Sequence, residues 1–186
     1  MGYAPRMKKI LLGVFGFLAL SLAGLLVAAV FQPDVTHVER SRVIRAAPET
    51  IMPQLTDMKR WVEWSPWSAI DPNTTWTFSD PTSGKGAWYT WEGNDEVGKG
   101  RMEVTDVTAD SVSYDLQFIE PFASEADVTM TLTPAAEGTK VVWSMDSENT
   151  FPSKVFMVFA DFDAMIGGDF EKGLANLAER VEASNG

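Results

Sequence analysis

The chain has 186 residues, no cysteine and one histidine, His37, and it carries a formal net charge of −11 at pH 7. This composition offers no thiolate or histidine cluster for zinc, copper or iron, so we expect no metal and no cofactor. Three basic residues precede an apolar N-terminal segment, which leaves 12 basic residues against 26 acids and a formal charge of −14 in the remainder. Such a surface repels phosphate backbones, and we expect no nucleic-acid partner.

Residues 10–31 are uncharged and mostly apolar. As a helix they would span about 33 Å, which is enough to cross a bilayer. The basic flank within residues 1–9 places the N-terminus in the cytoplasm and the following domain on the extracytoplasmic side. The alternative is a cleaved signal peptide and a secreted domain, because residues 21–23 and 27–29 resemble cleavage sites. The run is longer than a typical signal segment, which favours an uncleaved single-pass membrane anchor.

After a linker at residues 32–35, the pattern predicts a single α+β domain over residues 36–183. Its first segment, up to Arg45, mixes Val and Ile with charges and suits an exposed strand. A helix is expected to begin at Pro48, because proline is favoured at the first helical position. A second short helix is expected over Met58 to Trp64.

Between Thr74 and Asn149 the pattern changes to short alternating runs separated by turn residues. Alternation with a period of two predicts an antiparallel meander of strands. The two Gly-Lys-Gly triplets, at 84–86 and 98–100, lead into strands and not into helices. We therefore interpret them as hairpin turns and not as phosphate-binding loops.

The last segment again has helical periodicity. Large apolar residues recur at spacings of three and four from Val155 to Val181, which predicts one amphipathic helical face. We expect this helix to begin near Pro152 and to kink or divide at Gly167-Gly168, with Asp169 able to cap the second part.

No catalytic constellation is recognisable. His37 lies early on an exposed strand, and the chain has no Gly-x-Ser-x-Gly motif. Acidic pairs such as Asp161 with Asp163, or Glu92 with Glu103 beside Arg101, would serve acid–base chemistry only if one member were buried. Alternation instead predicts solvated positions for Glu103 and its neighbours, so we assign no catalytic residue.

Four stretches of the domain resemble the START-like superfamily, also called Bet v 1-like or SRPBCC, in its polyketide cyclase/dehydrase and lipid transport branch. They are RWVEWSPW at 60–67, GKGAWYTWEGN at 84–94, VGKGRM at 97–102 and GGDFEKGLANL at 167–177. The resemblance implies a helix-grip fold, in which a curved antiparallel sheet wraps around a long C-terminal helix. It also implies a hydrophobic ligand between sheet and helix, but it supplies no catalytic residues.

A curved sheet with large inward side chains predicts an apolar ligand-binding cavity. Alternation and the helical face assign eleven residues to it: Tyr89, Trp91, Met102, Tyr114, Leu116, Phe118, Met130, Trp143, Met145, Phe159 and Phe162. The charge of the domain disfavours an anionic headgroup, so we expect a neutral or largely hydrophobic guest.

These observations favour membrane-anchored binding or transport of a hydrophobic small molecule or lipid. One alternative is a non-catalytic envelope interaction protein with a filled core and an apolar patch around Trp61, Trp64 and Trp67. A cyclase- or dehydratase-like enzyme is the other, and it requires a buried titratable group in the cavity. The sequence leaves the oligomeric state open.

Overall fold

The computed structural model describes residues 4–121 and 123–183. These residues form two compact units. The first contains the chain up to Asp34 and the segment Asn149–Asp161, and the second contains Val35–Glu148 and the chain from Phe162 onward.

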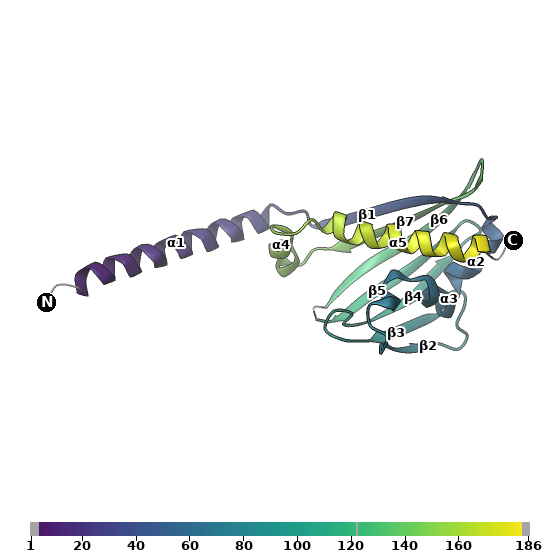
Figure 1. Cartoon of the computed structure of the whole chain (residues 1–186), viewed down its shortest axis with the longest axis horizontal. Coiled ribbons are helices and arrows are strands. Elements are labelled where there is room, and N and C mark those ends of the chain that lie inside the picture. The colour runs from purple at the N-terminus through teal and green to yellow at the C-terminus, as the bar shows by residue number, and fades with distance from the viewer. Residues whose placement is uncertain (1–3, 122, 184–186) are drawn as a thin grey trace. The chain divides into compact units, whose positions relative to one another are not determined.

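The second unit is built on one antiparallel sheet of seven strands in the order β1-β7-β6-β5-β4-β3-β2 (Figure 1). The strands are β1 (Val35–Ile44), β2 (Thr75–Phe78), β3 (Trp88–Glu92), β4 (Lys99–Val107), β5 (Ser111–Glu120), β6 (Ser124–Ala135) and β7 (Gly138–Glu148). From β2 to β7 each strand pairs with the next in sequence, as the alternating runs predict. The first strand departs from this order, since β1 pairs with β7 at the opposite edge.

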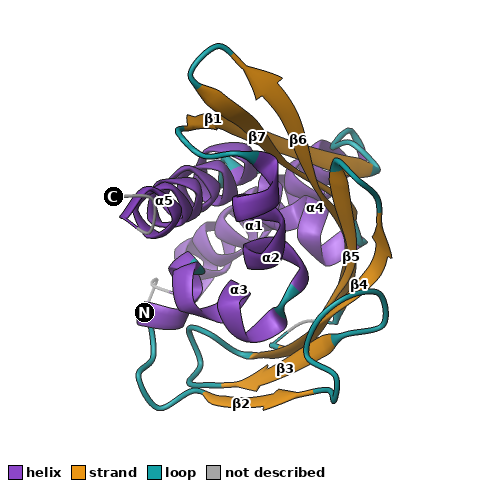
Figure 2. Ribbon diagram, turned by 90° about the vertical axis from the view of Figure 1, so that its right-hand side faces the viewer, coloured by secondary structure: helices purple, strands orange, loops and turns teal. Residues whose placement is uncertain are grey.

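The sheet curves around the helices of this unit (Figure 2). These are α2 (Pro48–Thr56), α3 (Met58–Trp64), the single 3-10 turn η1 (Pro66–Ala69) and the C-terminal α5 (Phe162–Ala183). Both short helices lie where the sequence predicts them. A curved antiparallel sheet around a long C-terminal helix is the helix-grip fold, and the expected fold class is confirmed.

The inner face of the sheet carries the residues that alternation assigns to it. Val104, Tyr114, Met130 and Val141 have at most 1% of their surface exposed. Because successive side chains on a strand point to opposite faces, the charged residues between them lie on the outer face.

Trp143 is the residue at which the sheet meets the helices. Its ring stacks on Phe170 of α5, with centroids 4.2 Å apart and planes inclined by 9°. Its other contacts are edge-on, at centroid distances of 5.4–5.8 Å, to Trp61 and Trp64 of α3 and Trp67 of η1. Aromatic pairs at such distances contribute stabilisation beyond the area they bury. The three tryptophans of the RWVEWSPW stretch are therefore part of the core, with Trp61 and Trp64 each 1% exposed.

The predicted division of the C-terminal helix at Gly167-Gly168 is wrong, because α5 is continuous through both glycines. The break lies earlier, between Met157 and Phe162. There the chain makes tight i→i−3 bonds, such as that from the N–H of Phe159 to the carbonyl of Phe156 at 3.0 Å, which end a helix.

Gly167 has a different role from the one predicted. The guanidinium of Arg40, on β1, occupies the space that a Cβ at this position would take, so glycine allows β1 to approach α5. Asp169 does not cap a helix either. It lies within α5 and accepts a hydrogen bond from Nε1 of Trp67 at 3.2 Å.

The first unit contains α1 (Ala4–Val30) and α4 (Phe151–Met157). Residues Ile10–Val30 form a span of 21 residues with a mean hydropathy of 2.6, long and apolar enough to cross a membrane. A signal sequence has the same properties. Helix α4 contacts α1, the N–H of Asn149 donates to the carbonyl of Asp34 at 2.8 Å, and Lys154 pairs with the Asp34 carboxylate.

Because α5 lies close to Trp143, we expect alanine at two glycines of α5 to have opposite effects on the stability of the domain. A Cβ at Gly173 would lie 2.7 Å from Cζ3 of Trp143 and 3.1 Å from Cδ of Pro66, whereas a Cβ at Gly168 would meet nothing within 4 Å. We expect Gly173→Ala to destabilise the domain by about 1–3 kcal/mol through overpacking. The control Gly168→Ala should stabilise it by about 0.5–1 kcal/mol through helix propensity.

Urea unfolding of the full chain in neutral detergent, followed by tryptophan fluorescence, measures both changes. Equal effects of the two substitutions would contradict the packing argument.

Candidate functional site

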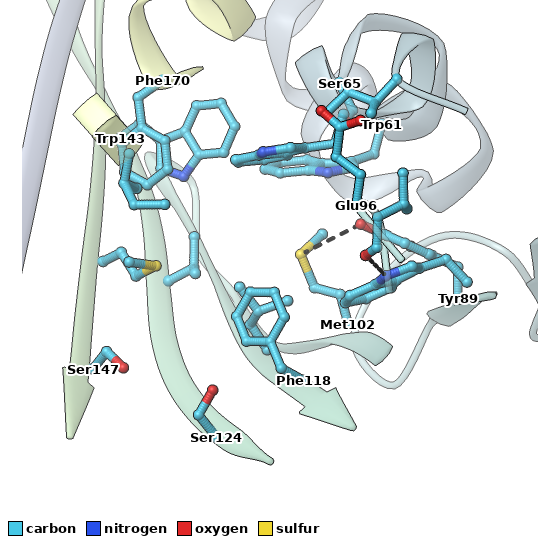
Figure 3. Close-up of a pocket in the computed structure, with 18 of the residues that line it drawn as sticks. Trp61, Ser65, Tyr89, Glu96, Met102, Phe118, Ser124, Trp143, Ser147 and Phe170 are labelled. Atoms are coloured by element: carbon cyan, nitrogen blue, oxygen red, sulfur yellow. Dashed lines mark hydrogen bonds between the residues drawn. The ribbon is translucent and has the colours of Figure 1, made fainter. Parts of the chain in front are cut away.

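A cavity of about 230 Å³ lies inside the second unit. Its walls are the inner face of β2 to β7, the α3–η1 segment and the first half of α5 (Figure 3). The volume remains because the curved sheet holds α5 away from β3 and β4, so the two surfaces do not interdigitate along their full length.

Eight of the eleven residues predicted to line a cavity do so: Tyr89, Trp91, Met102, Leu116, Phe118, Trp143, Met145 and Phe162. They come from four strands and one helix, and the fold brings them together as alternation predicts. Trp91 occupies its place because Gly100, directly opposite on β4, has no side chain. A Cβ there would overlap the Trp91 ring.

The other three predicted residues do not line the cavity. Tyr114 and Met130 are fully buried in the closed part of the core, where the Tyr114 hydroxyl donates to the carbonyl of Leu55 at 2.9 Å. Phe159 lies in the turn after α4, in the first unit, and is 75% exposed. Its prediction as an inward residue is wrong because the helical face from Val155 to Val181 is interrupted there.

Sequence reasoning missed several lining residues, chiefly Trp61, Trp67, Ile166 and Phe170. The sequence does indicate Ile166 and Phe170, since they follow Phe162 at spacings of four and eight on the same helical face. The two tryptophans gave no comparable signal, because no periodicity relates a short helix to a sheet that forms later in the chain.

The exposed rim of the cavity includes Ile70, Glu96 and Phe118. Buried Asp71 holds part of this rim, since its carboxylate accepts hydrogen bonds at 2.9 Å from the backbone N–H groups of Asn73 and Asn94. The loops that carry Ile70 and Glu96 are thereby joined.

The cavity wall has little charge. Glu96 is its single charged side chain among the described residues, and it lies at the rim. Burial raises the pKa of Tyr89 far above its usual value, although a hydrogen bond from Trp61 opposes this. The Tyr89 hydroxyl is therefore protonated at neutral pH, and it faces Sδ of Met102 at 4.0 Å.

None of the four acids considered for acid–base work lines the cavity. Glu92, Asp161 and Asp163 are exposed, while Glu103 is partly exposed and pairs with Arg101. Within the described part of the chain, no group of three or more metal-ligating side chains occurs.

Arg40 fixes the start of α5 to β1. Its Nε donates to Glu171 at 3.1 Å, and its terminal nitrogens donate to the Asp163 carboxylate at 2.9 and 3.1 Å and to the Asp163 carbonyl at 3.1 Å. We call this group of three residues the Arg40 clamp. It positions the helical turns that carry Phe162, Ile166 and Phe170 into the cavity wall.

Comparison with known proteins assigns the chain to a family. Residues 35–182 match the family model described as polyketide cyclase / dehydrase and lipid transport. The chain belongs to this family. The match covers the second unit and passes through the segment that joins β7 to α5. No curated protein matches the chain.

Solved structures similar to this family member share its fold at low sequence identity. TTHA0849 from Thermus thermophilus is 21% identical, with a TM-score of 0.57 over 81% of this chain and 100% of that one. CV1439 from Chromobacterium violaceum is 15% identical, with a TM-score of 0.57 over 81% and 99%. The protein Ara h 8.0201 is 13% identical, with a TM-score of 0.52 over 81% and 97%. These likenesses establish the Bet v 1-like fold.

The Arg40 clamp predicts a pH-dependent contribution to stability. The hydrogen bonds from Arg40 lower the pKa of Asp163 below its ordinary 3.8. The pKa of Asp163 is thus lower in the folded chain than in the unfolded chain. The ion pair therefore stabilises the fold fully when the pH is above the unfolded-state pKa, and this stabilisation is lost as the pH falls through the folded-state pKa. Asp163→Asn should therefore lower the free energy of unfolding at pH 7, and the difference from wild type should shrink in acid.

Urea unfolding at pH 7 and at about pH 3 tests this prediction, because the lower pH lies below the ordinary pKa of an aspartate. Glu137→Gln removes one negative charge outside the clamp and serves as the control. A difference for Asp163→Asn that does not change with pH would show that the ion pair does not contribute.

Proposed function

We propose that the second unit binds a hydrophobic small molecule or lipid in its cavity and that α1 holds it at a membrane. The cavity itself carries this proposal. Its wall is made mainly of aromatic side chains and methionines, which bury large apolar areas, and Met side chains adapt to irregular guests.

The charge of the site supports an uncharged guest. Its described wall contains no lysine, arginine or histidine, and its single charged residue is Glu96. An anionic group inside would be desolvated without a cation to compensate it. The surrounding domain, with a formal charge of −14, also repels anions.

Features of the first unit support an uncleaved anchor over a cleaved signal. Helix α4 belongs to the following part of the chain, yet it packs on α1. Outside the apolar span Ile10–Val30, four phenylalanines of this unit are exposed: Phe31 at 84%, Phe151 at 48%, Phe156 at 50% and Phe159 at 75%. Exposed aromatic residues beside a membrane-spanning helix suit the bilayer interface. The position of Phe159 then serves the membrane surface and not the cavity.

The two alternative functions have less support. The apolar surface patch that an interaction protein would present around Trp61 and Trp64 is absent, because both side chains are buried. Acid–base catalysis would need a buried titratable group near its working pH. The buried candidate in the described wall is Tyr89, whose pKa is shifted away from neutrality.

We expect the purified full chain to bind neutral hydrophobic probes in the cavity. The seven tryptophans all lie in the second unit, so energy transfer from tryptophan to N-phenyl-1-naphthylamine reports binding there. Val128→Phe adds a ring to the cavity wall and should weaken binding by about tenfold or more, since pockets discriminate steeply against lost space.

Thr129→Phe is the matched control, because the next residue on β6 points to the outer face of the sheet. The titration is made in neutral detergent, and native mass spectrometry of the same sample detects any guest that co-purifies. Equal binding by the two variants, or no binding by the wild type, would exclude the cavity as the site.

The anchor has its own test. Alkaline carbonate extraction of membranes should leave the full-length chain in the pellet, because a spanning helix remains inserted. A mature protein that begins near Gly24 or Val30 on N-terminal sequencing would instead establish cleavage of a signal peptide.

A further inference from the structure

The indole nitrogen of Trp143 is a buried donor without an acceptor. Among the described residues it is the one buried side-chain nitrogen or oxygen that has no hydrogen-bond partner. Trp143 is 2% exposed and lines the cavity, and Figure 3 shows its nitrogen on the cavity side of the ring stack. Burial of an N–H without an acceptor costs free energy, and buried tryptophan N–H groups usually have partners.

Three other indoles of the domain follow that rule. At 3.1–3.2 Å, Trp64 donates to a backbone carbonyl of α2, Trp67 to Asp169, and Trp91 to the carbonyl of Val97. A phenylalanine at position 143 would retain a stack on Phe170 without an unpaired donor. The edge contacts of the Trp143 ring account for its size, but they do not account for a buried N–H without an acceptor.

We propose that the N–H of Trp143 recognises the guest by donating a hydrogen bond to an uncharged oxygen that only accepts, such as a carbonyl. This inference rests on the proposed function and specifies its ligand class. A guest hydroxyl would satisfy the indole but would bring an O–H that itself needs an acceptor. A carboxylate on the guest would have no cation to pair with, because the one charged residue in the described wall is the acid Glu96.

The surroundings of Trp143 fix how such a guest lies. The inner wall beside it includes Met102, Val128 and Met145, each at most 5% exposed, whereas Ile70 and Phe118 at the rim are 37% and 38% exposed. The carbonyl therefore occupies the inner end, and the apolar remainder extends towards the rim. A volume of about 230 Å³ suits a guest smaller than a drug-sized molecule, for which pockets typically measure about 300–1,000 Å³.

A matched pair of probes isolates the hydrogen bond. Acetophenone and α-methylstyrene have the same skeleton and differ in a C=O replaced by C=CH₂. Their dissociation constants are measured by equilibrium dialysis against the full chain in lipid nanodiscs, with empty nanodiscs as the blank. We expect the preference of the wild type for the ketone over the hydrocarbon to fall about fivefold to tenfold in Trp143→Phe, in line with the loss of one hydrogen bond.

Trp67→Phe is the control, because it also lies in the wall but its N–H already has an acceptor in Asp169. It should leave the preference unchanged. The ratio of the two dissociation constants is compared between proteins. Differences in how the two probes partition into lipid therefore cancel, because they are the same for every protein.

A second measurement needs no variant and decides the question if Trp143→Phe does not fold. The stretching band of ¹³C-carbonyl acetophenone bound to the wild type should lie at lower wavenumber than in an apolar solvent, because its oxygen accepts a hydrogen bond. A band at the apolar-solvent position, or equal preferences in wild type and Trp143→Phe, would overturn this inference and leave the proposed function standing. Binding of neither probe would overturn both.

Discussion

The contacts of Trp143 hold the domain together and also shape its cavity. One face of its ring stacks on Phe170 of α5, and its edges meet tryptophans of α3 and η1. The strand β7, next to the edge strand β1, is thereby joined to three helical segments that lie elsewhere in the sequence. The helix can approach this closely because residue 173 is glycine. The position of α5 therefore depends on the large side chain of Trp143 and on the lack of a side chain at Gly173.

The cavity follows from the same arrangement. The contact of α5 with Trp143, together with the Arg40 clamp, holds the helix near β1 and β7. The sheet curves away from it towards β3 and β2 (Figure 2). Large side chains on β3 to β5 line the cavity on that side. Those side chains line the space without filling it, because aromatic rings cannot bend into every gap and the backbone behind them is fixed by strand pairing. The indole nitrogen of Trp143, which is the one buried side-chain nitrogen without a partner among the described residues, belongs to a ring that packs on the helices and also lines the cavity.

Much of this architecture could be predicted from the sequence, since it depends on local rules. Alternation identified the strands and their inner faces, and the proline at residue 48 marked the start of α2. The failures have a common cause in long-range packing. Gly167 suggested a division of the helix, but its small size is explained by Arg40, which is 127 residues earlier in the chain. The alternative of a surface patch around Trp61 fails for the same reason, because Trp61 packs on Trp143. Phe159 has the spacing of the helical face, yet a tight turn separates it from α5.

The Arg40 clamp also bears on how fast a guest can enter and leave. A guest that is too large to pass the exposed rim enters only when part of the wall moves, and the part that opens at the lowest cost sets its exchange rate. The start of α5 is held by four hydrogen bonds from one guanidinium, whereas β2 is a four-residue edge strand with β3 as its one pairing partner. Of these two parts of the wall, the β2–β3 flank is therefore the less restrained, and β2 lies at the edge of the sheet opposite to β1, away from Trp143 on β7. For a guest that exchanges through this flank, residence time and affinity would depend on different residues.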